Sequence, residues 1–292
     1  MRVFITGGAG FIGSAVVKEL IAHGHQVTGL ARSESNEASL KSVGAEIHRG
    51  SVDNLDSLRS GAAEADGVIH CAFNHDFSKF AANAEEDRRA LEVMAETLAG
   101  SDRPLISTSG LLGLAPGAVA TENNAASLMS PRRSESVLDY VLRGVRAMTI
   151  RLPPNTYEGA NGGFVPYLIG AARKHGVSAY VGDGRNRWPA AHRLDAASLY
   201  RLALEKGAAG ARYHAVGDEG IPFRDIAEVI GKRLNVPVVS KTPEEAPQHF
   251  GFLAMFAGMD SPASAALTRE QLGWRPTHTK LIANLEQANP LG

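Results

Sequence analysis

A glycine-rich segment near the N-terminus constrains the fold of this chain more than any other feature. Residues 2–5 form a short apolar run that predicts a β-strand, and residues 12–21 carry apolar side chains at helical steps. Between them, Gly8, Gly10 and Gly13 have the Gly-x-Gly-x-x-Gly spacing. Glycines at a strand–turn–helix junction permit a tight turn and let backbone N–H groups approach a pyrophosphate. The segment therefore predicts a dinucleotide-binding unit.

The alternation of strands and helices continues through the first half of the chain. Apolar runs predict strands at 26–30, 45–48, 67–71, 104–107 and 147–152, and helices at 54–63, 83–100 and 134–144. This order predicts a doubly wound, parallel α/β sheet with helices on both faces. The pattern loosens after Pro153–Pro154. We expect a dinucleotide-binding domain at 1–154, with return segments near 190–218, and a smaller, interleaved substrate-side domain mainly at 155–292.

The end of the second predicted strand bears on the choice of cofactor. An NAD site usually places Asp or Glu about 20 residues after the glycines, where the carboxylate bonds the ribose hydroxyls. This chain has Leu30-Ala31-Arg32-Ser33 there. A guanidinium binds a 2′-phosphate that a carboxylate would repel, so Arg32 with Ser33 favours NADP over NAD. The alternative is a solvent-exposed arginine at a strand end.

Further motifs follow over nearly the whole chain: Val3–Gly13, Val68–Ala72, Leu105–Ser109, Arg151–Tyr157, His192–Asp195 and Leu272–Pro276. Their sequences and order resemble those of the extended short-chain dehydrogenases/reductases, the NAD(P)-dependent epimerase/dehydratase family. The resemblance implies a Rossmann fold with cofactor contacts along the strand ends. On this chain the implied contacts are Gly7, Gly10, Phe11, Ile12, Gly13, Arg32, Ser33, Ser51, Val52, Cys71, Ala72, Phe73 and Pro153.

The chain departs from the family pattern at two points. Ser51 stands where the family has an Asp after its third strand. None of the six tyrosines is followed by lysine four residues later, so the family's proton-transferring Tyr-x-x-x-Lys motif is absent. The stretch Ser127–Glu135 occupies its place. The chain is thus similar to the atypical members of the family.

Polar groups near the predicted strand ends are candidates for the missing proton chemistry. Thr108 and Ser109 either bond a substrate oxygen or cap the end of the fifth strand. His75, with Asp76 beside it, either exchanges a proton near pH 7 or is polar surface. Tyr157 follows the proline pair and carries a phenol, but no neighbouring lysine lowers its pKa.

Two arginines occupy the place of the missing motif. Arg132 and Arg133 either stabilise an oxyanion and hold the cofactor ribose, or form a solvated pair at the start of a helix. We favour the solvated pair, because Pro131 and Glu135 are ordinary residues for a helix start.

The substrate side of the chain is apolar. Aromatic and methionine residues either line an apolar lid or belong to the core: Phe164, Trp188, Phe250, Phe252, Met255, Phe256 and Met259. No lysine and arginine cluster suggests a clamp for a nucleotide-sugar diphosphate, although Arg173, Arg185 and Arg187 are available. We therefore expect an uncharged, fairly apolar substrate.

The charge balance and the cysteine content argue against nucleic-acid binding, membrane binding and metal binding. Lys and Arg total 30 against 31 Asp and Glu, so unspecific binding to nucleic acid or anionic lipid is not expected. No apolar stretch reaches the ~18 residues of a membrane span. Cys71 is the sole cysteine and no histidine spacing suggests a zinc site, so we expect no metal. We expect a cytoplasmic protein. The family resemblance also suggests a homodimer through the helices at 83–100 and 134–144.

These observations predict an NADP-dependent oxidoreductase that transfers hydride between nicotinamide and a small, fairly apolar carbonyl or alcohol. In this prediction Thr108 and Ser109 orient the substrate oxygen, and His75 or Tyr157 exchanges the proton. One alternative is a sugar-type epimerase or dehydratase. The other is a non-catalytic NADP-binding sensor, which the missing Tyr-x-x-x-Lys motif favours.

Overall fold

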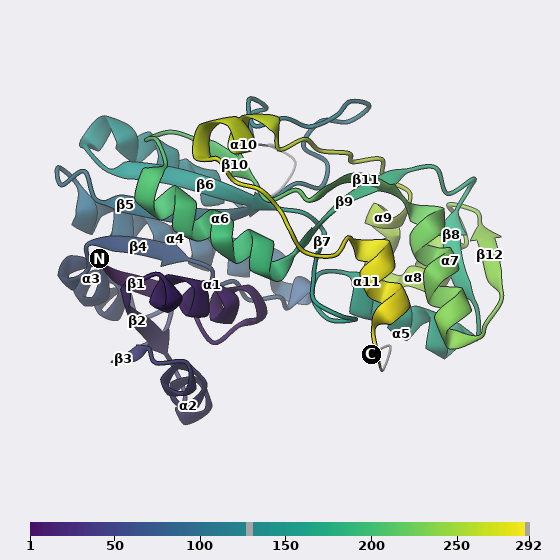
Figure 1. Cartoon of the computed structure of the whole chain (residues 1–292), viewed down its shortest axis with the longest axis horizontal. Coiled ribbons are helices and arrows are strands. Elements are labelled where there is room, and N and C mark those ends of the chain that lie inside the picture. The colour runs from purple at the N-terminus through teal and green to yellow at the C-terminus, as the bar shows by residue number, and fades with distance from the viewer. Residues whose placement is uncertain (127–130, 290–292) are drawn as a thin grey trace.

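The computed structural model describes residues 1–126 and 131–289. Its main feature is a seven-stranded sheet in the order β10-β6-β5-β4-β1-β2-β3, with every neighbouring pair parallel. The strands are β1 (Arg2–Thr6), β2 (Gln26–Ala31), β3 (Glu46–Arg49), β4 (Gly67–His70), β5 (Pro104–Gly110), β6 (Arg146–Leu152) and β10 (Arg212–His214). Helices cover both faces of this sheet (Figure 1), so the predicted doubly wound Rossmann fold is confirmed.

The two faces of the sheet carry two separate cores. In β1, Val3 and Ile5 belong to one core and Phe4 to the other, because successive side chains of a strand point to opposite faces. All three side chains are fully buried. The helices of the first face are α1 (Phe11–Ala22) and α6 (Arg193–Lys206), and those of the second are α3 (Leu55–Glu64), α4 (Phe80–Leu98) and the 3₁₀ helix η2 (Ser134–Arg143).

A smaller lobe follows β6, on the right of Figure 1. Its strands form a three-stranded sheet, β11-β9-β7, and a two-stranded sheet, β12-β8. Trp188 and Phe223 meet edge to face, with ring centroids 4.7 Å apart, inside its core. The elements are β7 (Asn155–Tyr157), α5 (Val165–His175), β8 (Ser178–Val181), β9 (Arg187–His192), β11 (Asp218–Pro222), α7 (Phe223–Leu234), β12 (Val238–Lys241), α8 (Ala246–Phe250), η3 (Gly251–Leu253), α9 (Ala254–Ala257) and α11 (Leu281–Gln287).

The chain returns to the large sheet twice. The first return supplies α6 and β10, and the second supplies α10 (Ala266–Leu272), which lies against both. Interleaving of this kind was expected for residues near 190–218. The division at residue 154 stays a prediction.

Local features explain where the sequence pattern misled. Helix α2 (Glu34–Ser42) was not predicted, because its sequence has almost no apolar periodicity. Leu40 is its sole buried residue. The apolar stretch 250–259 does not form one helix, because Gly251 has a positive φ of 57° and divides it into short turns. The short 3₁₀ helix η1 (Phe77–Lys79) precedes α4.

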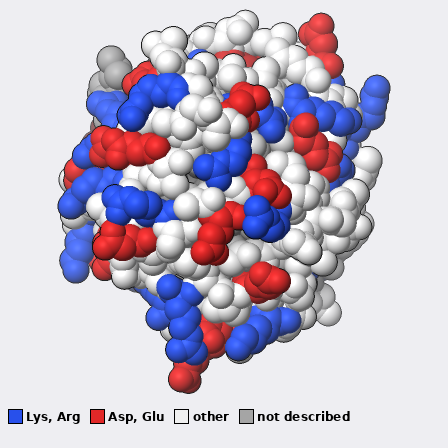
Figure 2. All heavy atoms as spheres, turned by 90° about the vertical axis from the view of Figure 1, so that its left-hand side faces the viewer, with Lys and Arg blue, Asp and Glu red and all other residues white. Residues whose placement is uncertain are grey.

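The surface agrees with the balanced charge. Figure 2 shows acidic and basic side chains interspersed over the face at the large-sheet end of the molecule. That face offers no patch of one sign that would favour a nucleic acid. Within the described part of the chain, no helix combines the length and apolarity that crossing a membrane requires.

Candidate cofactor and substrate site

A cavity of about 1930 Å³ lies at the carboxyl ends of the central strands. The glycine-rich loop forms one end, the segments after β4, β5 and β6 form the middle, and aromatic residues of the smaller lobe form the other end. The carboxyl ends of the strands are where open α/β sheets bind ligands. Almost all of the cofactor contacts expected from the sequence line this cavity.

Backbone geometry explains the glycines of the loop. Gly7 has a φ of +71°, and a Cβ there would lie 2.6 Å from the backbone nitrogen of Ala72. A Cβ on Gly13 would lie 2.1 Å from the carbonyl oxygen of Gly7. Helix α1 begins at Phe11 behind this turn, with no side-chain cap and no acidic residue in its first turn. Its N–H groups and positive end thus lie beside the cavity.

The far end of the loop side carries charges of both signs. Two arginines, two glutamates and two serines line a shallow hollow that adjoins the large cavity: Arg32, Arg49, Glu34, Glu37, Ser33 and Ser51. The Ser33 hydroxyl also caps α2 by accepting a bond from the backbone N–H of Asn36, at 3.3 Å. Arg32 and Arg49 come from the ends of adjacent strands β2 and β3, which are parallel and paired. Arg49 was missed in the sequence, although a basic residue at the end of the neighbouring strand is a usable signal.

Two polar residues at and after the end of β3, Arg49 and Ser51, bond to acidic side chains. The Arg49 Nε lies 2.9 Å from a Glu37 carboxylate oxygen. The Ser51 hydroxyl donates to Asp53, and this bond is the main reason that the pKa of the Asp53 carboxyl is below its ordinary value. Ser51 and Val52 both line the cavity, as the resemblance implied.

Residues after β4 form the floor of the middle section. Cys71, Ala72 and Phe73 line the cavity, and burial raises the pKa of the Cys71 thiol to about 11. A thiol with this pKa is not a nucleophile near neutral pH. These residues therefore shape the cavity without supplying reactive groups.

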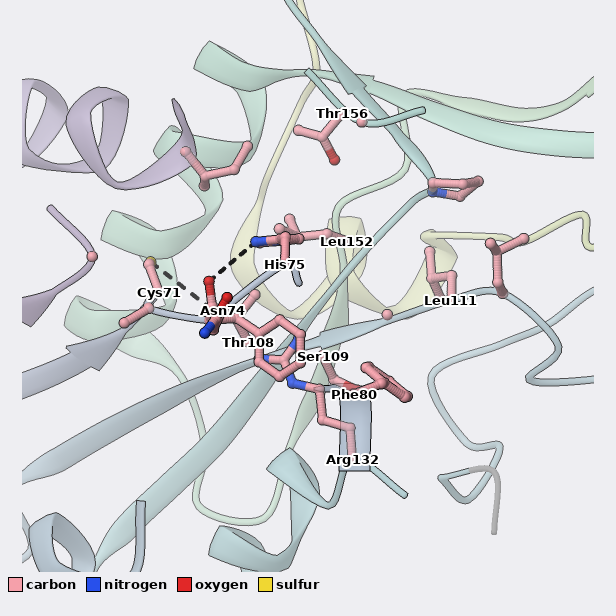
Figure 3. A pocket seen from close by; sticks show the side chains of 18 of the residues that line it. Cys71, Asn74, His75, Phe80, Thr108, Ser109, Leu111, Arg132, Leu152 and Thr156 are labelled. Atoms are coloured by element: carbon pink, nitrogen blue, oxygen red, sulfur yellow. Dashed lines mark hydrogen bonds between the residues drawn. The ribbon is translucent and has the colours of Figure 1, made fainter. Parts of the chain in front are cut away.

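The two hydroxyls at the end of β5 differ. The Thr108 hydroxyl donates to the carbonyl oxygen of His70 and pairs with the Tyr200 hydroxyl, both at 2.7 Å. Ser109, one residue later, is half-buried and lines the cavity. Figure 3 shows both near Cys71, His75 and Arg132. Thr108 thus joins strand ends, and Ser109 is the hydroxyl placed to meet a ligand.

The two candidates for proton exchange, His75 and Tyr157, lie in different surroundings. His75 lines the cavity, and its Nδ1 lies 3.1 Å from the carbonyl oxygen of Phe73. Partial burial, with the nearby charge of Arg132, lowers the pKa of His75 below 6.5. Tyr157 lies in the core of the smaller lobe, outside the cavity lining, and its hydroxyl donates to the Thr279 carbonyl oxygen at 2.6 Å. Burial raises the Tyr157 pKa, so the structure does not support it as a proton donor.

Arg132 differs most from expectation. Its guanidinium lies 4.0 Å from the centre of the Phe73 ring and 3.1 Å from Asp87. The side chain is 19% exposed and lines the cavity. The solvated pair that we favoured is therefore wrong for Arg132, because a buried carboxylate on α4 draws it inward. Residues 127–130 of the stretch in place of the missing motif lie outside the described residues.

Aromatic side chains form the wall contributed by the smaller lobe. Phe164 stacks on Phe256 at 5.8 Å, and Tyr167 meets Phe252 edge to face at 5.1 Å. Met255 and Met259 complete this wall. Trp188 and Phe250, which the sequence grouped with them, belong to the core instead. Arg173, Arg185 and Arg187 do not line the cavity among the described residues, and Arg187 pairs with Asp260 at 2.8 Å.

The described residues contain no group of three or more His, Cys, Asp or Glu side chains arranged to hold a metal ion. Pro153 lines the cavity beside Leu152 and Thr156, at the end of β6. The cavity thus combines an anion-binding turn, a short row of polar side chains at the strand ends, the arginines Arg132, Arg133 and Arg212, and an apolar wall.

Comparisons with known proteins bear on the family and the fold of the chain. Residues 3–106 match the model of the NAD-dependent epimerase/dehydratase family. An uncharacterised protein of Schizosaccharomyces pombe is 48% identical over 289 residues, which is 98% of each chain. A 4-hydroxy-2-methyl-3-oxo-4-farnesyl-3,4-dihydroquinoline-1-oxide ketoreductase of Stigmatella aurantiaca is 25% identical over 100% of this chain and 98% of its own. Among solved structures, an NAD-bound dTDP-glucose 4,6-dehydratase of Streptomyces venezuelae superposes with a TM-score of 0.77 at 20% identity, over 99% and 95% of the two chains.

Proposed function

Because the chain belongs to the NAD-dependent epimerase/dehydratase family, we propose that it is an NADP-dependent oxidoreductase of a fairly apolar carbonyl compound or alcohol. The observation that carries the proposal is that one cavity joins the glycine turn, Ser109 and an aromatic wall. A dinucleotide sensor needs the first of these features, and an oxidoreductase of apolar substrates uses all three.

The glycine turn fits a dinucleotide by shape. At Gly7 and Gly13 a Cβ would strike the protein's own backbone, so glycine is what permits the tight turn that such a site needs. The N-terminus of α1 would hold the pyrophosphate through its N–H groups. Ser51, Val52 and Ala72 would flank the adenosine half, and Pro153 would border the nicotinamide.

The two arginines of the hollow support NADP over NAD. Arg32 directly follows β2 and Arg49 ends β3, and Ser33 adds a hydroxyl, beside the carboxylates of Glu34 and Glu37. Two guanidinium groups favour a phosphate on the ribose, since charge-assisted bonds to phosphate are the strong ones. Glu37 bonds Arg49, so its carboxylate holds an arginine in place.

The chemistry divides between the cofactor and the chain. When bound, the nicotinamide supplies or accepts the hydride. Ser109 donates a hydrogen bond to the substrate oxygen and orients the reacting carbon. In alcohol oxidation His75, which is neutral at pH 7 because its pKa is lowered, accepts the hydroxyl proton.

The aromatic wall supports an apolar substrate. The rings of Phe164, Tyr167, Phe252 and Phe256 contact one another along one side of the cavity. The related ketoreductase of Stigmatella acts on a farnesylated quinoline, a compound with a large apolar part. We place the ketone or alcohol of this protein's substrate near Ser109 and its apolar part on this wall.

A sugar epimerase or dehydratase is the second candidate, favoured by the fold of the superposed dehydratase. Such enzymes also oxidise their substrate transiently, so the same cofactor site serves both. The two functions differ in net consumption of NADPH.

The experiment follows NADPH absorbance with wild-type protein, Ser109→Ala and the distant control Ser240→Ala. The probes are uncharged aromatic and terpenoid ketones, with UDP-glucose as the sugar probe. We expect wild-type and Ser240→Ala to oxidise NADPH with a ketone, and Ser109→Ala to lose about tenfold to a hundredfold in kcat/KM, as loss of one bond in the transition state implies. NADPH binding without turnover of any ketone would refute the proposal and favour the sensor.

A further inference from the structure

We propose that Arg132 is a catalytic residue whose guanidinium stabilises the negative charge on the substrate oxygen, and that Asp87 and His70 position it. This inference rests on the proposed oxidoreductase function. It assigns a role to a chain of polar groups that the cofactor site does not use.

The chain of polar groups runs from the glycine turn to the cavity. The Arg132 Nε and Nη2 donate to the two carboxylate oxygens of Asp87, at 3.3 and 3.1 Å. The Ser134 hydroxyl donates to the same carboxylate at 3.0 Å. His70 Nε2 lies 3.3 Å from Asp87, and His70 Nδ1 lies 2.7 Å from the Thr6 hydroxyl, the residue before Gly7. Four elements thus fix one guanidinium.

Burial of this network shows that it fixes an orientation. Thr6, His70 and Asp87 are 0%, 1% and 4% exposed. Burial alone would raise the pKa of Asp87, but the His70 hydrogen bond and the charge of Arg132 outweigh it and lower that pKa to about 2. Asp87 is therefore an anion at any pH at which the protein works. A buried ion pair adds little net stability compared with apolar packing, so its physical effect here is to hold Arg132 in one place.

The held guanidinium lies where the reaction occurs. It covers the Phe73 ring at the end of β4, and Figure 3 shows it beside Ser109 at the end of β5. Its charge lowers the pKa of His75, Cys71 and Tyr200, although burial is the larger influence on each and raises the pKa of Cys71 and Tyr200 overall. Arg132 therefore acts on the same space as the proposed proton acceptor and the proposed hydroxyl donor.

Charge compensation determines what the guanidinium recognises. A lone arginine in a cavity attracts carboxylates and phosphates. Asp87 offsets that attraction, while the guanidinium stays 19% exposed and lines the cavity. The pair thus suits a neutral carbonyl that becomes negative only in the transition state.

The step balances as follows. Hydride from the reduced nicotinamide adds to the carbonyl carbon, and the electron pair of the C=O π bond moves to the oxygen. Arg132 and Ser109 stabilise that oxygen while it is negative, and it then takes the proton of protonated His75, which is the reverse of the step proposed for alcohol oxidation. The carbonyl is reduced to the alcohol and NADPH is oxidised to NADP⁺.

The test compares Arg132→Gln and Arg132→Lys with Arg143→Gln, an exposed arginine at the end of η2 outside the cavity lining. Each variant is assayed with the ketone that wild-type protein reduces best, and NADPH affinity is measured by nucleotide fluorescence. We expect Arg132→Gln to lower kcat by about 100-fold to 1000-fold, the range for loss of one oxyanion donor. Its NADPH Kd should stay within about threefold of wild type, which also shows that it is folded. The kcat of Arg132→Lys should lie between those of wild type and Arg132→Gln, because an ammonium cannot make the paired bonds to Asp87.

Chemical rescue tests the positioning role. Methylguanidinium added to Arg132→Ala should restore at least about a tenth of the lost kcat, and should restore none in the double variant Arg132→Ala/Asp87→Asn. Unchanged kcat in Arg132→Gln, or rescue that does not depend on Asp87, would overturn the corresponding part of the inference. Failure of wild-type protein to reduce any ketone would instead overturn the proposed function on which the inference rests.

Discussion

The two ends of the cavity are built in different ways. The phosphate end is built mainly on backbone, a glycine turn and the start of α1 within a few residues of one another, to which Arg32 and Arg49 add side chains from the ends of β2 and β3. The reactive end consists of side chains brought from distant parts of the chain, such as Thr6 and His70, 64 residues apart, and Asp87 and Arg132, 45 residues apart. Backbone sites of the first kind are set by local sequence, whereas sites of the second kind exist only once the sheet has formed.

The largest expected effect concerns stability at the reactive end. Asp87→Ala leaves Arg132 and His70 without their shared carboxylate and should lower the free energy of unfolding by about 3–5 kcal/mol. Glu37→Gln at the phosphate end breaks a pair with the exposed Arg49 and should cost less than about 1 kcal/mol. Urea unfolding of both variants measures the difference. Equal losses in the free energy of unfolding would show that Asp87 at the reactive end contributes no more to stability than Glu37 at the phosphate end.

The contribution of Asp87 should depend on pH. Its folded-state pKa of about 2 lies below the ordinary 3.8, so the stabilisation is complete above 3.8 and is lost as pH falls through 2. At 1.36 kcal/mol per unit this amounts to about 2 kcal/mol. The stability advantage of wild type over Asp87→Asn should shrink over that range, and a constant advantage would contradict the account.

The next effect concerns cofactor binding at the phosphate end. Gly13→Val places a branched side chain where a Cβ alone would lie 2.1 Å from the Gly7 oxygen. The turn must move, at about 3 kcal/mol or more, which corresponds to about 100-fold in NADPH Kd. Gly170→Ala, on α5 with open space at its Cβ, is the matched control and should bind NADPH as wild type does. Near-normal NADPH affinity in Gly13→Val would show that the glycine turn does not bind the cofactor.

A smaller effect separates the two dinucleotides. Arg32→Ala and Arg49→Ala should each weaken NADPH binding by about tenfold to a hundredfold, the value of one charge-assisted bond. NADH binding should be unchanged, since NADH has no 2′-phosphate. Fluorescence titration with both nucleotides checks this. Equal losses for NADH and NADPH would mean that these arginines bind another part of the cofactor.

The apolar wall should affect substrate affinity alone. Phe252→Ala removes a ring that meets Tyr167 at the cavity and should raise KM for an apolar ketone by about tenfold. NADPH Kd should not change. Leu142→Ala, with a 94% exposed residue far from the lining, controls for loss of an apolar side chain. A change in NADPH Kd with unaltered KM would place Phe252 on the cofactor instead.

The smallest effect is the pH dependence of alcohol oxidation. Burial and Arg132 lower the pKa of His75 below 6.5, so the imidazole accepts a proton at neutral pH and loses this ability as pH falls through that pKa. The oxidation rate should therefore decline on the acid side of pH 6.5, and His75→Gln should remove that decline. Arg132→Gln should move the decline toward higher pH. A profile that His75→Gln leaves unaltered would exclude His75 as the base.

The same contrast explains what the sequence could predict. The spacing of Gly8, Gly10 and Gly13 follows from backbone geometry, so the Rossmann fold could be predicted. The role of Arg32 at the phosphate end stays a prediction, and Arg49 was missed. Helix α2 could not be predicted, because its Leu40 is the sole buried residue on an otherwise polar helix. Arg132 was misjudged because its partner Asp87 lies on another helix, and Tyr157 because nothing local shows that its hydroxyl faces Thr279.

The most direct measurement follows the hydride itself. Wild-type protein is incubated with a ketone and NADPH that carries deuterium at both hydrogen positions of C4 of the nicotinamide, and the product is examined by mass spectrometry. Our account predicts one deuterium on the carbinol carbon of the alcohol and one NADP⁺ formed for each alcohol. Alcohol without deuterium, or NADPH bound tightly and left unoxidised with every ketone, would contradict hydride transfer as the function of this protein.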